Sequence, residues 1–341
     1  MSTPESRRLG APSPTGPFAD QVCLADIEAA AGRVRDVVVR TPLLPAPELA
    51  ELSGAAEVRI KCENLQLAGA FKARGASNFV QSLADGELGN GVITYSSGNH
   101  AQAVALAARI RGIAAVVVMP TTAPSVKVAG ARRLGARVEF EGTTSLERKA
   151  RAEAIAEAEG LVMIPPFDHP AIIAGQGTVG LEIVEEWPDV DTVLVPIGGG
   201  GLASGVAVSV RGLRPEARIW GVEPAGGASM QAAFAHAGPV TLPSTGSIAD
   251  GLLPVRAGEL TYQHLVRLAE GVVTVTDDAI RCGTAFLLQR HRLVTEFSGG
   301  ATTAALISKQ IDLTGRRVAV VVSGGNIDPA QLAEVATGAA A

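Results

Sequence analysis

From about residue 90 onward, short apolar runs alternate with helix-forming segments, and this alternation limits the choice of fold more than any other feature of the chain. Residues 145–159, for example, spread Leu146, Ala150, Ile155 and Ala158 along a helical face. The runs expected to form strands are residues 92–95, 115–119, 136–140, 161–164, 192–197, 218–222, 272–275 and 317–322. Uninterrupted apolar strands between helices are typical of parallel sheets covered on both faces. We therefore predict an α/β protein.

The length of 341 residues is enough for about two domains, at roughly 150 residues each. Residues 1–20 are rich in proline, serine and glycine and contain no apolar core. They therefore do not match a secretory signal, and we expect a loose tail. No apolar run approaches the roughly 18 residues that a membrane span requires, so we expect no membrane partner.

Charge, cysteines and histidines exclude further classes of function. The 29 basic and 34 acidic residues give a net charge of −5 without a basic tract, so nucleic acid is not an expected partner. Cys23, Cys62 and Cys282 are isolated thiols, which favours a reducing cytoplasm and argues against disulfides or a zinc site. The five histidines form no HExxH pair, so catalytic zinc is not expected.

Three of the expected strands run directly into glycine-rich turns, which read TYSSGNH, VPIGGGGLASG and VVSGGNID. In open α/β sheets, ligands bind beyond the carboxyl ends of the strands, where such turns lie. Three turns of this kind in one chain predict a single site that is assembled from distant segments.

The loop Gly198–Gly201 follows one of these strands and precedes a predicted helix. A backbone without Cβ atoms can turn sharply and aim several N–H groups at one anion, and the helix N-terminus adds positive charge. This pattern predicts a phosphate site. The loop also satisfies G-x-G-x-x-G/A through Gly198, Gly200 and Ala203, and Glu223 lies where a ribose-binding acid is expected. A nicotinamide-dependent oxidoreductase is therefore an alternative.

Lys72 lies between apolar neighbours in GAFKARGA, with Arg74 close by in sequence. An amine that is desolvated or near another cation has a lowered pKa and becomes a usable nucleophile toward a carbonyl. The turns SSGN (residues 96–99) and SGGN (residues 323–326) offer hydroxyl, amide and backbone N–H groups, although capping of the next helix would also explain the hydroxyls. Together, these features describe a site for a phosphorylated aldehyde.

Taken in order, the segments form a recognisable set: ENLQLAGAFKARGA, SSGNHAQAVA, PFDHPAIIAGQGT, VPIGGGGLASG, GVEP, SIADG followed by R-x-GEL, and VVSGGNID. They run from about residue 61 to about residue 328. The chain resembles the fold-type II pyridoxal-phosphate enzymes, within the serine/threonine dehydratase branch. The resemblance implies two domains, each an open, mostly parallel twisted sheet with helices on both faces.

Carried over residue by residue, the resemblance implies a role for each matching position. Lys72 would hold pyridoxal 5'-phosphate covalently. The other positions implied to bind the cofactor are Phe71 against its ring, Asn99 at the ring hydroxyl, Ser323 at the pyridine nitrogen, and Gly198, Gly199, Gly200 and Gly201 around the phosphate. Those implied to bind the substrate carboxylate are Ser96, Ser97, His100 and Arg148.

The implied reaction is the dehydration and deamination of a β-hydroxy amino acid, such as L-threonine or L-serine, to a 2-oxo acid and ammonia. After an amino acid displaces Lys72, the freed amine would remove the Cα proton. A serine or amino-acid racemase of the same fold is an alternative, because in the resembling racemases the serine at position 97 serves the opposite face of Cα. Pro254 stands where those racemases carry a serine. For a metal site, only Glu223 and the Gly227 carbonyl remain as candidate ligands, and one carboxylate would bind a divalent ion weakly.

The resemblance also predicts the domain boundaries. A large cofactor-binding domain is expected over residues 21–91 and 166–341, and a small mobile domain over residues 92–165 would close over it. A homodimer is expected from the resemblance alone. The chain ends about fifteen residues after SGGN, so we expect no inhibition by isoleucine through a C-terminal regulatory domain.

Overall fold

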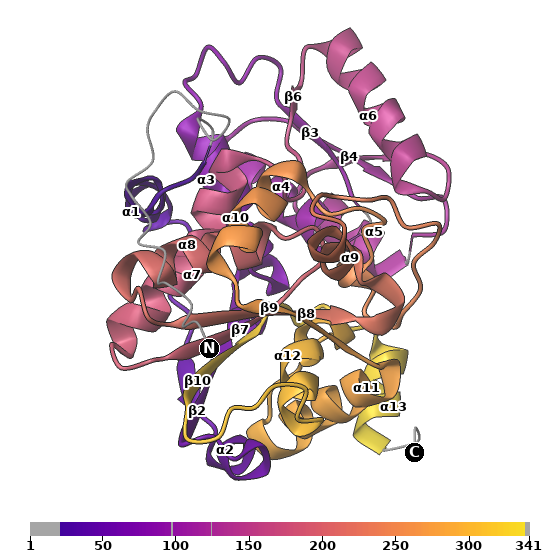
Figure 1. Ribbon diagram of the computed structural model, residues 1–341. Helices are drawn as coiled ribbons and strands as arrows, with labels where there is room; N and C mark the ends of the chain where they lie inside the picture. The colour runs from indigo at the N-terminus through magenta and orange to yellow at the C-terminus, as the bar shows by residue number, and fades with distance from the viewer. Residues whose placement is uncertain (1–20, 97, 124, 338–341) are drawn as a thin grey trace.

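The computed structural model describes residues 21–96, 98–123 and 125–337, which form two sheets with helices on both sides (Figure 1). The larger sheet has the strand order β1-β2-β10-β7-β8-β9, and the smaller one has the order β5-β4-β3-β6. All neighbouring strands are parallel except β1, which is antiparallel to β2. The predicted α/β class is therefore confirmed.

The strands of the larger sheet are β1 (Leu43–Pro45), β2 (Glu57–Cys62), β7 (Thr192–Pro196), β8 (Arg218–Pro224), β9 (Gly271–Val275) and β10 (Arg317–Val322). Those of the smaller sheet are β3 (Val92–Tyr95), β4 (Ala115–Met119), β5 (Arg137–Phe140) and β6 (Val162–Met163). The α-helices are α1 (Leu24–Val34), α2 (Pro47–Ser53), α3 (Lys72–Ser82), α4 (Asn99–Arg111), α5 (Ser125–Arg133), α6 (Ser145–Glu159), α7 (Pro170–Glu186), α8 (Gly201–Leu213), α9 (Ser229–Ala235), α10 (Glu259–Leu268), α11 (Asp277–Phe286), α12 (Phe297–Ile307) and α13 (Pro329–Thr337). Among the described helices, none has both the length and the apolar character needed to cross a bilayer.

Strand β10 runs through the centre of the larger sheet, and its alternating side chains build the core on both faces. Val318, Val320 and Val322 pack with residues of α2, α11 and α12, whereas Ala319 and Val321 pack with residues of α7 and α8. Each buried valine contributes roughly 1.5–3 kcal/mol through the removal of apolar surface from water. Burial on both faces explains why the sequence of this strand is a continuous apolar run.

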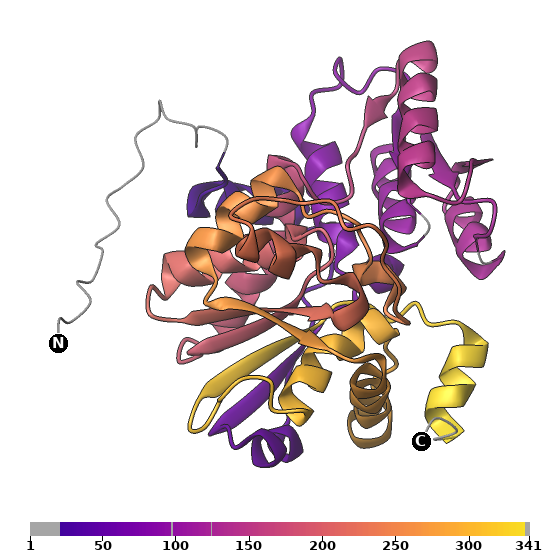
Figure 2. The same cartoon turned by 45° about the vertical axis from the view of Figure 1, so that its right-hand side comes forward.

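The smaller sheet is covered in the same way and stands beside the larger one (Figure 2). Val92, Val117 and Met119 pack with residues of α4 and α5, whereas Val116 and Val118 pack with residues of α6. Helix α6 begins at a capping box in which Thr144 and Glu147 bind each other's backbone N–H groups, and it ends at Gly160 with a left-handed φ of 66°. The predicted bounds of this helix agree with the structure.

Strands β2, β10 and β7 are adjacent and parallel, so their carboxyl ends meet at one edge of the larger sheet. The residues that follow them therefore converge there: Glu63–Leu65 and Lys72 after β2, the turn 323–326 after β10, and the glycine loop after β7. This edge carries the candidate site. Strands β1 and β2 were not among the predicted strands.

Candidate active site

The segment before Lys72 lies against the turn that follows β10, and backbone hydrogen bonds hold the two together. Phe71 N donates to Ser323 O at 3.0 Å, and Gly325 N donates to Gly69 O at 2.8 Å. Gly69 has a left-handed φ of 72°, and a Cβ there would lie 2.3 Å from the Oδ1 of Asn326. The glycine thus allows two segments that are more than 250 residues apart in sequence to place Lys72 beside the buried Ser323.

Lys72 is the first residue of α3, and its amine is held by the chain that leaves the smaller sheet. Lys72 Nζ donates to Pro166 O at 2.5 Å and lies 5.1 Å from the centre of the Phe71 ring. Burial lowers the pKa of Lys72 to about 8. About a tenth of the amine is therefore unprotonated at pH 7, far more than for an ordinary lysine, and only this form is a nucleophile toward an aldehyde.

Arg74 does not act on Lys72 as the second cation that the sequence suggested. Its guanidinium, with a fully buried side chain, binds both carboxylate oxygens of Glu63 at 2.7 and 2.8 Å and those of Glu182 at 2.7 and 2.9 Å. Lys61 Nζ donates to Glu182 at 2.5 Å, so the two cations and two anions of the network balance. This network anchors the first turn of α3 to β2 and α7.

The glycine loop joins β7 to α8, and its conformation requires glycine. Gly200 has a φ of 97°, and a Cβ there would lie 2.8 Å from side-chain atoms of Met230 and Thr261. A Cβ on Gly199 would lie 2.2 Å from the ring of Phe167. Ser204 N donates to Gly200 O, so α8 begins directly at the loop, and its first N–H groups have no acceptor within the helix. The sequence prediction of an anion-binding loop fits this geometry.

Asp168 and Thr261 support the loop from the side of α10, and sequence reasoning missed both. The Asp168 carboxylate accepts hydrogen bonds from the N–H groups of Glu259, Leu260 and Thr261 at 3.0–3.1 Å, which caps α10. The Thr261 hydroxyl then donates to Gly199 O at 2.7 Å. The signal for Asp168 was its place directly after Phe167 in the segment PFDHP.

Asn99 is the first residue of α4, and its amide lies at the junction of the two sheets. Asn99 Nδ2 donates to Glu296 Oε1 at 2.5 Å, and Asn99 Oδ1 accepts from Asn326 Nδ2 at 2.8 Å. Asn99 therefore lies beside the turn that contains Ser323. The sequence analysis assigned no role to Glu296. The feature that could have indicated one is its position directly before a helix of small residues.

The other candidates after β3 divide into three cases. Ser96 Oγ accepts from Gly98 N at 3.3 Å, which is a contact within the turn, whereas the N-cap residue of α4 is Gly98, so Ser96 does not cap this helix. Ser97 lies outside the described residues. His100 is buried, its Nε2 lies 3.2 Å from Ile164 O, and burial together with the charge of Lys72 lowers its pKa to about 3. His100 is therefore neutral near Lys72, with the proton on Nε2 facing the carbonyl.

Arg148 and Glu223 lie apart from this cluster. Arg148, in the first turn of α6, donates to Thr143 O at 3.2 Å, and within the described residues no hydrogen bond or ion pair joins it to the residues around Lys72. Glu223 is fully buried, and its two oxygens accept from Met230 N and Gln231 N at 2.8 Å. Both oxygens are thus occupied by the start of α9, which speaks against a ribose-binding role.

Across the described ranges, no group of three His, Cys, Asp or Glu side chains is arranged to hold a metal ion, and Gly227 is buried beside Leu252 and Leu253.

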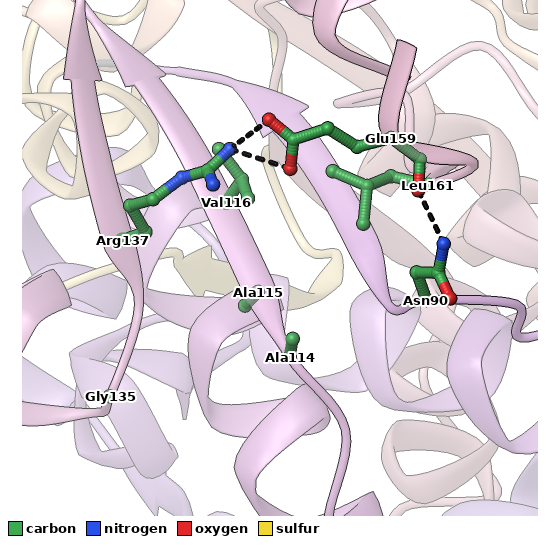
Figure 3. Close-up of a pocket in the computed structure, with 8 residues that line it drawn as sticks. All are labelled: Asn90, Ala114, Ala115, Val116, Gly135, Arg137, Glu159 and Leu161. Atoms are coloured by element: carbon green, nitrogen blue, oxygen red, sulfur yellow. Dashed lines mark hydrogen bonds and ion pairs between the residues drawn. The ribbon is translucent and has the colours of Figure 1, made fainter. Parts of the chain in front are cut away.

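Two cavities differ in their relation to the site. One of about 480 Å³ lies at the amino ends of β4 and β5, at the opposite edge of the smaller sheet, and its polar side chains are paired with their own neighbours (Figure 3). In it, Arg137 donates to both carboxylate oxygens of Glu159 at 2.7 and 2.9 Å. The other cavity, of about 320 Å³, is lined by Lys127, Asp250, Glu296, Asn326 and Asp328, among others, and adjoins the Asn99 contact.

The donor set at this edge fits pyridoxal 5'-phosphate. A weakly basic amine suits the aldehyde, the glycine loop at the start of α8 suits the phosphate, and the spare N–H of Asn99 with the hydroxyl of Ser323 suits the polar atoms of the ring.

Comparison with known proteins agrees with this assignment. Residues 34–324 match the family described as "Pyridoxal-phosphate dependent enzyme". The chain is 42% identical to the L-threonine ammonia-lyase of Thermotoga maritima, over 90% of this chain and 76% of that protein. It is 43% identical to the catabolic L-threonine dehydratase TdcB of Escherichia coli K12, over 82% of this chain and 85% of that protein. The structure of maize serine racemase superposes with a TM-score of 0.89, at 37% identity and over 93% of this chain and 98% of that one. The chain therefore belongs to the family of pyridoxal-phosphate-dependent enzymes.

Proposed function

We propose that the protein dehydrates and deaminates a β-hydroxy amino acid, with L-threonine or L-serine as the default substrate, and releases a 2-oxo acid and ammonia. The observation that carries this proposal is the amine of Lys72, which burial brings to a pKa of about 8 beside Ser323. The similarity to L-threonine ammonia-lyase over 90% of the chain supports the choice of reaction.

In this proposal, each part of the site holds one part of the cofactor. Lys72 binds the aldehyde covalently, and the Phe71 ring lies against the cofactor ring. Gly198, Gly199, Gly200 and Gly201 bind the phosphate, because the backbone N–H groups at the start of α8 point to an anion. Asn99 donates to the ring hydroxyl, and Ser323 faces the pyridine nitrogen.

The residues of the chain then move the substrate's Cα proton and bind the substrate's carboxylate. Bound pyridoxal phosphate supplies the electron sink that makes the substrate's Cα proton acidic. Lys72, once its amine is released and unprotonated, accepts that proton at Nζ. Lys72 Nζ then returns this proton to the β-hydroxyl, which leaves as water. A second water hydrolyses the released enamine to the 2-oxo acid and ammonia. Ser96 donates its hydroxyl proton to the substrate carboxylate while its oxygen keeps the bond from Gly98 N, and Ser97 and His100 lie around the same carboxylate. Arg148, which lies apart from these residues in this structure, would reach the carboxylate when the small domain closes.

We also propose that residues 92–165 form a small domain that closes over a large domain of residues 21–91 and 166–341. Helices α4 and α5 of the small domain reach the large one through polar contacts, among them the hydrogen bond of Asn99 with Glu296 and the ion pair of Lys127 with Asp250, which would form as the domains close. We further propose that the protein is a homodimer, which the resemblance supports. We also propose that it is cytoplasmic, which agrees with three cysteines that form no disulfide in the structure.

The visible spectrum of the purified protein tests the proposed function. Protein supplied with pyridoxal 5'-phosphate should show a band that borohydride abolishes, and mass measurement should place the reduced adduct on Lys72. Lys72→Ala should lose the band, whereas Lys149→Ala, which removes an exposed lysine that pairs with Glu153, should keep it. A panel of β-hydroxy amino acids assayed for 2-oxo acid and ammonia then identifies the substrate. A wild-type protein without the band contradicts the proposal.

Racemisation is the second candidate, because the maize serine racemase superposes over almost the whole chain. Pro254 lies against the glycine loop, with its Cδ 3.4 Å from the position of a Cβ on Gly198. It presents no hydroxyl where the resembling racemases carry a serine, which favours elimination. Chiral analysis of the remaining amino acid distinguishes the two reactions.

A further inference from the structure

Glu296 is a buried carboxyl group that the reaction described above does not use. It directly precedes α12, and only 5% of its surface is exposed. Its Oε1 accepts from Asn99 Nδ2 at 2.5 Å, which is the only side-chain contact of Asn99 with an anion among the described residues. Glu296 N donates to Gly324 O at 3.1 Å, so the residue is also tied to the turn after β10.

The hydrogen bonds around Asn99 determine which way its amide faces. Asn326 Nδ2 donates both to Asn99 Oδ1 and to Ala68 O, each at 2.8 Å, so both of its protons are used. The Asn99 oxygen must therefore face Asn326, and one Asn99 N–H must face Glu296. The second Asn99 N–H remains available for a ligand.

Gly324 provides the space for this arrangement. A Cβ at that position would lie 2.5 Å from Glu296 Oε1 and 3.1 Å from Asn99 Nδ2. Its backbone φ is not in the left-handed region, so the requirement for glycine comes from the close approach of the carboxylate. The second residue of the SGGN turn is therefore shaped by the contact between Glu296 and Asn99.

The Glu296 carboxyl group changes its protonation state near pH 7. Burial, assisted by the carboxylate of Asp250, raises the pKa of Glu296 to about 7, although Lys127 and the hydrogen bond from Asn99 oppose the rise. These groups come from η4 (Asp250–Leu252) and α5, and Asp328, before α13, lines the same cavity of about 320 Å³. The cavity gives Glu296 a route for proton exchange.

We propose that Glu296 is a positioning residue that orients the Asn99 amide and, through its negative charge, strengthens the hydrogen bond that Asn99 donates to the ring hydroxyl of pyridoxal phosphate. The proposal rests on the role of Asn99 in the proposed function. An ionised acceptor polarises the amide, which makes the other N–H a stronger donor. A stronger donor at the ring oxygen favours its ionised form, and this form determines the visible absorption of the bound cofactor.

The test compares Glu296→Gln with Asp328→Asn, in holoenzyme and in apoprotein titrated with pyridoxal 5'-phosphate. Glu296→Gln keeps the size of the side chain and removes its charge. Asp328→Asn removes a charge from the same cavity, and the Asp328 side chain bonds to Ala330 N and not to Asn99. The ratio of the two absorption bands of the bound cofactor should change with pH around 7 in wild type and in Asp328→Asn. In Glu296→Gln this transition should disappear, and the cofactor dissociation constant should rise about tenfold.

A double-mutant cycle separates positioning from a general structural role. If Glu296 acts through Asn99, Glu296→Gln should change neither the spectrum nor the cofactor affinity when Asn99 is already alanine. Equal effects in the two backgrounds overturn the proposal, as does a Glu296→Gln spectrum that matches wild type across the pH range. A wild-type protein without any lysine-bound band refutes the proposed function instead, so the two failures are distinguishable.

Discussion

The amine of Lys72 donates a hydrogen bond to the carbonyl oxygen of Pro166 at 2.5 Å, which joins the first residue of α3 to the chain that leaves the smaller sheet. The same short segment holds the other parts of the site. Ile164 O accepts from the Thr94 hydroxyl at 2.8 Å and lies 3.2 Å from His100 Nε2, and the Phe167 ring lies against Gly199. The connection between the two sheets is therefore a structural part of the candidate active site.

The lowered pKa of Lys72 predicts how cofactor attachment depends on pH. Only the unprotonated amine attacks the aldehyde, so the rate at which apoprotein binds pyridoxal 5'-phosphate covalently should rise about tenfold per pH unit below pH 8. Above this value it should level off. Stopped-flow absorbance measures the rate, and an increase that continues to pH 10 would show that the amine keeps its ordinary basicity.

The buried network around Arg74 predicts a large loss of stability when one charge is removed. Glu63→Gln should lower the free energy of unfolding by about 3 kcal/mol, because a buried guanidinium loses an ionised partner. Burial alone would raise the pKa of the Glu63 carboxyl group. The charge of Arg74 and the hydrogen bonds from its guanidinium outweigh burial, so the pKa of Glu63 is lowered. The contribution should thus be present above about pH 4.5 and be lost as the pH falls further.

Urea unfolding measures this effect, and Glu159→Gln is the matched control. Glu159 also makes a two-point contact with an arginine, but that pair is exposed to solvent (Figure 3). Its removal should change the free energy of unfolding by less than about 1 kcal/mol. Equal losses in the two variants would contradict the role given to burial.

Gly200→Ala tests the conformation of the phosphate loop. A Cβ at a φ of 97° is strained, and it would lie 2.8 Å from Met230 and Thr261, so we expect a loss of about 1–3 kcal/mol in stability and weaker cofactor binding. Gly86→Ala is the control, since nothing lies within 4 Å of its Cβ position and its φ is not left-handed. Thermal unfolding with and without pyridoxal 5'-phosphate distinguishes a lost phosphate site from a general loss of stability.

Thr261→Val tests the support that α10 gives to the loop. The substitution removes the hydroxyl that donates to Gly199 O at 2.7 Å and nearly preserves the volume, so stability should fall by about 1 kcal/mol and cofactor affinity should fall with it. Thr303→Val is matched to it, because the buried Thr303 hydroxyl has no hydrogen-bond partner in the described structure. That variant should be neutral or slightly stabilised, and an equal loss in both would argue against the support.

Much of the fold was predictable because its strands are buried on both faces. β3, β4 and β10 have the bounds that their apolar runs predicted, and Ser145–Glu159 forms α6 as expected. β1 and β2 were missed, because Leu43–Pro45 is only three residues long and Glu57–Cys62 carries Glu57, Arg59 and Lys61 among its apolar residues. Lys61 is nevertheless fully buried, since Glu182 on α7 neutralises it.

Local sequence determined the strand ends, the glycine loop and the presence of a lysine between apolar neighbours, because these depend on backbone freedom and on side-chain pattern over a few residues. Only the tertiary structure decided what those residues experience. It directed Arg74 toward Glu63 and Glu182 and away from Lys72, it lowered the pKa of Lys72 by burial alone, and it placed Glu296 against Asn99. Burial and charge pairing depend on which distant segments pack together, and a short stretch of sequence does not contain its partner.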